Sequence, residues 1–99
     1  MHIISGEFKV KDESRDALIK MSLTLIPLSL KEPGCISYSF YEDQARPGHF
    51  LFFERWKGRE DIATHFEKSY FKDFAEKFPD MIEGEATIEI HEVASTESV

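Results

Sequence analysis

Cysteine, proline and glycine are scarce in this chain of 99 residues, which contains one Cys, four Pro and five Gly. The single cysteine, Cys35, excludes an intrachain disulfide and any metal site built from several thiolates of one chain. No run approaches the roughly 18 apolar residues that a membrane-spanning helix needs. The first residues also lack the basic stretch and apolar run of a signal peptide, so we expect a cytoplasmic protein.

Positive charge is also in short supply. The chain has 12 Lys and Arg residues against 19 Asp and Glu residues, which gives a formal net charge of −7. No local cluster of basic residues offsets this balance. Because phosphate backbones and anionic lipid headgroups attract cations, we expect neither nucleic acid nor a membrane surface as a partner.

Motifs for cofactors and metals are absent. The sequence contains no G-x-G-x-x-G, no G-x-x-x-x-G-K-[ST] and no G-x-S-x-G, the signatures of dinucleotide, nucleotide and serine-hydrolase sites. His2, His49 and His91 are scattered without the H-x-H or H-E-x-x-H spacing of metal ligands. We therefore expect no cofactor and no metal site.

Apolar residues make up 41% of the chain, with nine Phe, three Tyr and one Trp. This content suffices for one small folded domain, which we place at residues 1–94, followed by a polar tail at 95–99. Strand-forming residues and period-two alternation predict strands at 2–10, 35–42, 49–56 and 85–93. In the second of these, we expect Ile36, Tyr38 and Phe40 to share one face.

Apolar residues at helical spacing predict the remaining elements. A helix is expected from an N-cap at Asp12 to a point before Pro33, with a bend near Pro27. Its apolar stripe is expected to consist of four residues: Leu18, Met21, Leu25 and Leu28. Further helical pieces are expected at 59–68 and 70–78. The order β-α-β-β-α-β predicts an α+β, ferredoxin-like fold with a four-stranded antiparallel sheet and helices on one face.

The third predicted strand is apolar at four consecutive positions, Phe50 to Phe53. A strand with two apolar faces is typical of one buried on both faces. Since helices cover only one face of such a sheet, the other face needs a different cover. We therefore expect a homodimer that forms through the sheet face.

Three segments together carry a family resemblance: Glu32-Pro33-Gly34-Cys35, Glu54-Arg55-Trp56, and His65 followed by Ser69 and Phe71. In this order and spacing they resemble the antibiotic biosynthesis monooxygenase domain, a member of the dimeric α+β barrel superfamily. The resemblance spans about residues 3–92. It implies small, cofactor-independent oxygenases that act on quinols, anthrones and related aromatics, in a family that also contains isomerases, haem-degrading enzymes and members without known chemistry.

Haem degradation is not expected for this chain. The haem-degrading relatives use an Asn on the first strand and a Trp and a His on the second helical region. The corresponding positions here are Ser5, His65 and Ala75. Because that triad is missing, the resemblance does not extend to its activity.

His65 is the candidate catalytic residue, because it borders the apolar stripe of its helix and an imidazole can take a proton from an acidic phenol. Trp56 and Glu54 lie on one face of the third strand. An indole can stack on an aromatic substrate, and a glutamate can orient a histidine or act as a base. The alternatives are a structural histidine, a core tryptophan and a structural ion pair.

Tyr38, Tyr70 and Phe71 are candidate pocket walls, with ordinary core packing as the alternative. A tyrosine hydroxyl in an apolar cleft can stabilise a developing oxyanion. Together these residues favour a cofactor-independent monooxygenase that oxidises a small hydroxyaromatic compound with O2. A non-oxidative isomerase of a small metabolite and a non-catalytic binding protein remain open alternatives.

Overall fold

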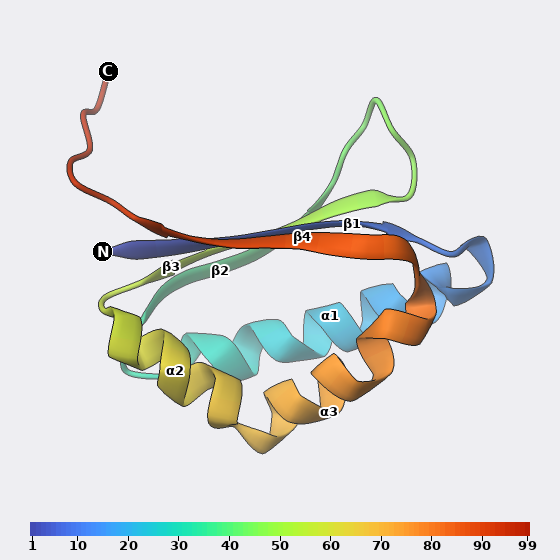
Figure 1. Cartoon of the computed structure of the whole chain (residues 1–99), viewed down its shortest axis with the longest axis horizontal. Coiled ribbons are helices and arrows are strands. Elements are labelled where there is room, and N and C mark those ends of the chain that lie inside the picture. The colour runs from blue at the N-terminus through green and yellow to red at the C-terminus, as the bar shows by residue number, and fades with distance from the viewer.

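The computed structural model describes residues 1–99 and contains four strands and three α-helices. Two short 3-10 turns, η1 and η2, join α1 to β1 and α3 to β4 (Figure 1). The elements follow the chain in this order: β1 (His2–Val10), η1 (Asp12–Ser14), α1 (Arg15–Leu30), β2 (Cys35–Glu42), β3 (His49–Trp56), α2 (Arg59–Glu67), α3 (Ser69–Lys77), η2 (Phe78–Met81) and β4 (Ile82–Glu92).

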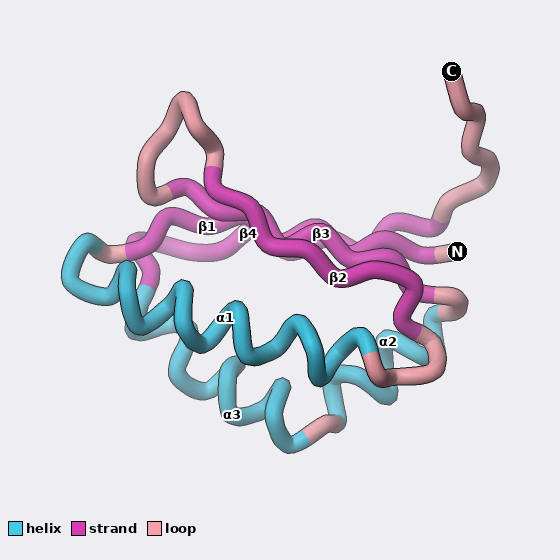
Figure 2. Tube along the Cα trace, turned by 180° about the vertical axis from the view of Figure 1, so that it is seen from behind, coloured by secondary structure: helices cyan, strands magenta, loops and turns pink.

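The strands form one antiparallel sheet in the order β2-β3-β1-β4. All three helices lie on the same face of this sheet. The opposite face carries no helix, and the loop between β2 and β3 and the C-terminal tail rise on that side (Figures 1 and 2). The predicted α+β fold with a ferredoxin-like sheet is confirmed. The second helical region is two helices, α2 and α3, as the two pieces of its apolar pattern indicated.

The core lies between the helices and the sheet. Alternation along the central strands points Ile4 and Phe8 of β1, and Phe50 and Phe52 of β3, toward the helices. Eleven buried apolar residues form this core: Ile4, Phe8, Val10, Leu18, Leu25, Tyr38, Phe50, Phe52, Trp56, Ile62 and Ile82.

The predicted stripe of α1 needs correction. Leu18 and Leu25 are fully buried, but Leu28 is 36% exposed, and Ser22 and Ser29 take the remaining buried positions. The buried face therefore follows offsets of four, three and four, and a small side chain at two of its positions lets the helix lie close to the sheet. Serine carries no apolar signal, which is why the sequence pattern favoured Leu28.

The start of the predicted first helix also differs from expectation, whereas its predicted end before Pro33 is confirmed. Asp12 does not cap α1, because it lies in the 3-10 turn η1 and makes no capping hydrogen bond. Pro27 lies inside α1, which continues to Leu30. The residue is on the exposed side, and Leu23, whose carbonyl loses its amide partner, is 54% exposed. Water can therefore satisfy that carbonyl.

Two strand details also depart from the pattern. The pairing of β2 with β3 shifts between Cys35 and Ser37, so Ile36 occupies a bulge and is 48% exposed instead of sharing the face of Tyr38. Strand β4 begins at Ile82, three residues earlier than predicted, because Gly84, at φ 66°, interrupts the sequence pattern without ending the strand.

The uncovered face of the sheet is partly apolar. Leu51 and Phe53 of β3 are half-buried there, and Tyr41 of β2 is 55% exposed. The two-sided burial predicted for β3 is thus complete only on the helix side within one chain. A second molecule on this face would complete it.

Candidate functional site

An apolar cavity of about 250 Å³ lies between the sheet and the helices. It extends to the edge strand β4, where Ile88 is 60% exposed, so the cavity reaches solvent beside that strand. Eleven of its 13 lining residues are hydrophobic. They are Ile4, Gly6, Phe8, Tyr38, Phe52, Glu54, Phe66, Phe71, Phe74, Ala75, Phe78, Ala86 and Ile88.

Glu54 is the one carboxyl group in the cavity wall. It lies on β3, is 5% exposed, and accepts a hydrogen bond of 3.0 Å from the indole N–H of Trp56. Burial raises the pKa of Glu54 from 4.5 to about 7, against the opposing effect of that hydrogen bond. Near neutral pH this carboxyl group therefore exists in both its protonated and its ionised form, as a general base requires.

Tyr38 is the only hydroxyl-bearing residue of the cavity wall. Strand β2 pairs it directly with Glu54 of β3, so the two side chains leave the sheet on the same face. Burial raises the pKa of Tyr38 well above its usual value, with the nearby Glu54 carboxylate adding to the effect. The hydroxyl therefore stays protonated and is available as a hydrogen-bond donor.

His65 lies behind this wall, fully buried on α2. Its Nδ1 is 2.6 Å from Oε2 of Glu32, which also accepts a hydrogen bond from the hydroxyl of Tyr70. Burial lowers the pKa of His65, although the Glu32 carboxylate acts in the opposite direction. The imidazole is therefore neutral at pH 7, and its Nε2 is buried without a hydrogen-bond partner.

Aromatic rings surround the imidazole of His65. Its centroid lies 4.7 Å from that of Trp56 and 4.8 Å from that of Phe71. Tyr38 approaches edge-on, with ring centroids 5.7 Å apart. Because Tyr38 and Phe71 also line the cavity, the histidine is separated from the cavity by a single layer of side chains.

The six predicted site residues therefore form one connected cluster. Tyr38, Glu54 and Phe71 line the cavity. Trp56, His65 and Tyr70 lie in the layer behind it and contact those walls or each other. Sequence reasoning missed Glu32 as a site residue. It also missed nine apolar residues of the lining: Ile4, Phe8, Phe52, Phe66, Phe74, Ala75, Phe78, Ala86 and Ile88.

Gly34 explains how Glu32 reaches the helices. A Cβ atom added at Gly34 would lie 2.2 Å from Cγ of Asp61, in the first turn of α2. The backbone carbonyl of Gly34 also accepts a hydrogen bond of 2.9 Å from the N–H of Lys57, just before α2. The absence of a side chain thus brings the loop after α1 against the start of α2, with Glu32 beside His65.

Gly34→Ala is therefore expected to destabilise the protein by about 1–3 kcal/mol, because Asp61 or the loop must move. Urea unfolding of the variant measures this loss. Gly84→Ala is a useful comparison, since no atom lies within 4 Å of a Cβ atom there and only the strain of its positive φ applies. An unchanged free energy of unfolding for Gly34→Ala would show that the close approach is not required.

Cys35 follows this loop and is half-buried. Burial raises the pKa of its thiol to about 11, with the Glu54 and Glu32 carboxylates adding to the effect. The side chain is thus a thiol and not a thiolate at neutral pH, as expected of a small hydrophobic residue and not of a nucleophile.

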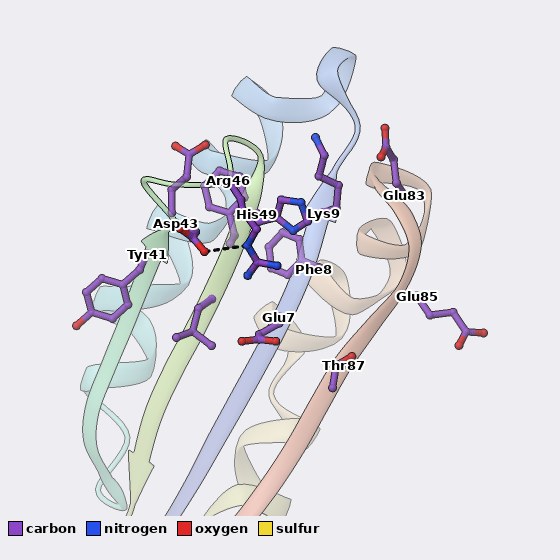
Figure 3. Close-up of a pocket in the computed structure, with 13 residues that line it drawn as sticks. Glu7, Phe8, Lys9, Tyr41, Asp43, Arg46, His49, Glu83, Glu85 and Thr87 are labelled. Carbon is purple, nitrogen blue, oxygen red and sulfur yellow. Dashed lines mark hydrogen bonds and ion pairs between the residues drawn. The ribbon is translucent and has the colours of Figure 1, made fainter.

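A second, larger hollow of about 460 Å³ lies on the uncovered face of the sheet. Figure 3 shows its residues: Glu7 and Lys9 rise from β1, and Arg46 of the β2–β3 loop forms an ion pair of 2.9 Å with Asp43. Its lining is mostly charged and polar, with carboxylates on β4 spread along its rim. Such a surface does not fit a flat aromatic molecule, whereas the apolar cavity does.

The chain contains no group of three or more His, Cys, Asp and Glu side chains arranged to hold a metal ion. None of its helices combines the length and the apolar character needed to cross a membrane.

Comparison with known proteins assigns the chain to a family. The sequence profile described as antibiotic biosynthesis monooxygenase matches residues 1–77. An uncharacterised protein of Synechocystis is 43% identical over 97 residues, which cover 98% of this chain and 66% of that protein. The chain thus spans slightly less than two thirds of this relative. YcnE of Bacillus subtilis, which carries the provisional name monooxygenase, is 26% identical over 82 residues, covering 83% of this chain and 86% of YcnE.

Solved structures support the fold. A Deinococcus radiodurans protein, provisionally named an antibiotic biosynthesis monooxygenase, superposes with a TM-score of 0.92 at 22% identity. The superposition covers 100% of this chain and 98% of the other. At this level of identity the likeness establishes the architecture and not the chemistry.

Proposed function

Because the chain belongs to the antibiotic biosynthesis monooxygenase family, we propose that it is a cofactor-independent monooxygenase that oxidises a small hydroxyaromatic compound with O2. The observation that carries this proposal is the apolar cavity with one carboxyl group, Glu54, in its wall. The cavity suits a flat aromatic ring, and the carboxylate suits its hydroxyl group. An isomerase that acts on a polar metabolite would need several polar groups, which this cavity lacks.

In the proposed reaction the substrate is itself the reductant. A base removes its acidic proton, the resulting anion gives one electron to O2, and the two radicals combine to form a carbon–oxygen bond. Loss of water from this peroxide leaves a carbonyl group. For a CH2 group between aromatic rings, one oxygen atom of O2 enters the product, the other leaves as water, and the four electrons come from the substrate.

The protein contributes burial, orientation and a base. Glu54 is the ionisable carboxyl group in the cavity wall, and Tyr38 would donate a hydrogen bond to the developing oxyanion. His65 has a free Nε2 one layer behind the wall and is the other candidate base. Trp56 and Tyr70 would hold these groups in place, and Phe71 would pack against the substrate ring.

The proposal includes a homodimer that forms through the uncovered face of the sheet. Leu51, Phe53 and Tyr41 leave apolar surface on that face, which a second copy of the chain would bury. The same contact would bury β3 on both faces, as its sequence predicts. Nucleic acid and membranes are not proposed as partners, because the net charge is −7.

Oxygen uptake with a panel of quinols and anthrones, without added cofactor, tests the proposed activity. We expect uptake well above the rate of autoxidation without protein. Glu54→Gln is expected to reduce it by two or more orders of magnitude if the carboxylate is the base. The control, Glu60→Gln, changes an exposed glutamate at the start of α2 and should retain full uptake.

His65→Ala distinguishes the two candidate bases. Loss of uptake in this variant but not in Glu54→Gln assigns proton removal to the histidine. If no substrate is oxidised, but several raise the free energy of unfolding, the protein is a binding protein. A ligand at 100 times its Kd contributes about 2.7 kcal/mol to that free energy.

A further inference from the structure

Glu32 is the feature of this region that the proposed chemistry leaves without a role. It lies between α1 and β2, is 8% exposed, and contacts side chains from two other helices. One oxygen, Oε2, faces both Nδ1 of His65 on α2 and the hydroxyl of Tyr70 on α3. The carboxylate therefore accepts hydrogen bonds from side chains of two different helices, which links α2 and α3 to the loop after α1.

The backbone holds Glu32 in a fixed position. Its N–H donates to the carbonyl of Ser29 at 3.0 Å, and its own carbonyl accepts from the N–H of Cys35 at 3.0 Å. Pro33 restricts the conformation of the residue before it, and Gly34 allows the close approach to α2 described above. The carboxylate is therefore aimed at His65 by the loop and not by chance packing.

This geometry fixes the tautomer of the imidazole. An ionised carboxylate only accepts hydrogen bonds, so the atom of His65 that faces Glu32 must carry a proton. That atom is Nδ1. In a neutral ring the other nitrogen, Nε2, then has a free lone pair, and Nε2 is the atom that is buried without a partner.

We propose that Glu32 is a positioning residue that holds His65 in its Nδ1-protonated form, leaving Nε2 as a proton acceptor, and joins α2 to α3 through Tyr70. The effect of Glu32 on catalysis rests on the proposed function, whereas its effect on the tautomer of His65 does not. Phe66 of α2 and Phe71 of α3 line the cavity, so the same carboxylate also fixes two of its walls relative to each other.

Few other groups near His65 could accept a hydrogen bond from its Nδ1. The titratable and charged groups that act on His65 are Glu32 of the loop and Lys68 after α2. The hydroxyl-bearing rings of Tyr38 and Tyr70 pack against the imidazole from β2 and α3. Glu32 alone provides an acceptor at hydrogen-bond distance from the ring.

Nitrogen-15 NMR of the histidine side chains tests the proposal on the whole protein and without a substrate. In the wild-type protein at pH 8, His65 is expected to show a protonated Nδ1 and an unprotonated Nε2. Tyr70→Phe removes only the second hydrogen bond to Glu32 and should leave this pattern unchanged. Glu32→Gln, whose amide can also donate, should allow the Nε2-protonated tautomer to appear.

The result that overturns the inference is an Nε2-protonated His65, or an imidazolium, in the wild-type protein at pH 8. This measurement stands even if Glu32→Gln does not fold. An unchanged tautomer in a folded Glu32→Gln would also overturn it, since a merely structural carboxylate would affect stability alone.

If oxygen uptake is found, Glu32→Gln should lower kcat on the order of 100-fold with little change in KM, because ground-state binding in the apolar cavity does not involve Glu32. If the tautomer is as expected but no substrate is oxidised, the proposed function fails and the role of Glu32 remains. The two proposals can thus be tested separately.

Discussion

Phe52→Asp is expected to abolish folding, whereas Phe53→Asp, one residue further along the same strand, is expected to give a folded monomer. Phe52 is 7% exposed, and its ring lies 4.7 Å from that of Phe40 and 5.8 Å from that of Phe74. A carboxylate at this position loses its hydration without gaining a partner, which costs several kcal/mol. Small domains have only about 5–15 kcal/mol of stability in total.

Phe53 points to the opposite face of the sheet, where it is half-buried and packs under the guanidinium of Arg55 at 5.0 Å. An aspartate here keeps its hydration in a single chain and has a cation beside it. In the proposed dimer it would be buried against the second copy. We therefore expect this variant to fold and to be monomeric.

Circular dichroism and light scattering measure the two outcomes. The wild-type protein is expected at twice the chain mass of 11.5 kDa, Phe53→Asp at 11.5 kDa with native secondary structure, and Phe52→Asp without it. Phe53→Leu, which keeps an apolar side chain, serves as the matched control and should remain dimeric. A wild-type monomer, or a dimeric Phe53→Asp, would contradict the proposal that the sheet face is the interface.

The two positions also show what the apolar periodicity of the sequence can predict and what it cannot. Alternation along β3 revealed that neighbouring phenylalanines face opposite ways, since a strand has a period of two. It could not reveal which face the helices cover, because that depends on how distant segments pack. For the same reason the bulge at Ile36 and the buried serines of α1 were missed: neither leaves a mark in the apolar pattern.

In the candidate site, too, the contacts within one strand could be predicted from the sequence, and those between distant segments could not. The sequence placed Glu54 and Trp56 on one strand face, and the structure joins them by a hydrogen bond. The contact between Glu32 and His65, 33 residues apart, depends on how the loop after α1 meets α2. No local pattern encodes such a contact, although Pro33, directly after Glu32, predicted that the first helix ends before it.

Glu54→Gln is expected to change how the stability of the protein depends on pH. The pKa of Glu54 is about 7 in the folded protein and near 4.5 for an unburied glutamate. A raised pKa means that the folded state binds the proton more tightly, so the contribution of this group is complete below pH 4.5 and is lost as the pH rises through 7. Over that range the loss amounts to about 3 kcal/mol.

Glutamine has the shape of the protonated acid and does not titrate, so its contribution stays constant. Between pH 5 and pH 8, urea unfolding should therefore show the free energy of unfolding of the wild-type protein falling by about 2.5 kcal/mol relative to that of the variant. His65, whose pKa is lowered by burial, has the opposite trend, with its contribution lost as the pH falls below about 6.5. It is present in both proteins and cancels in the difference.

Glu60→Gln, at an exposed position, should show no such gain, and equal pH slopes for Glu54→Gln and the wild-type protein would refute the raised pKa. The loss of stability occurs in the pH range where an ionised Glu54 would serve as a base. A structural carboxyl group would gain from a cation beside it, but the groups that act on Glu54 are the Trp56 N–H, the Tyr38 hydroxyl and the Glu32 carboxylate, and none of them is a cation. An ionisable group retained at a cost in stability within an apolar cavity is what a catalytic base requires, and a glutamine that stabilises the fold but stops oxygen uptake would demonstrate that trade-off.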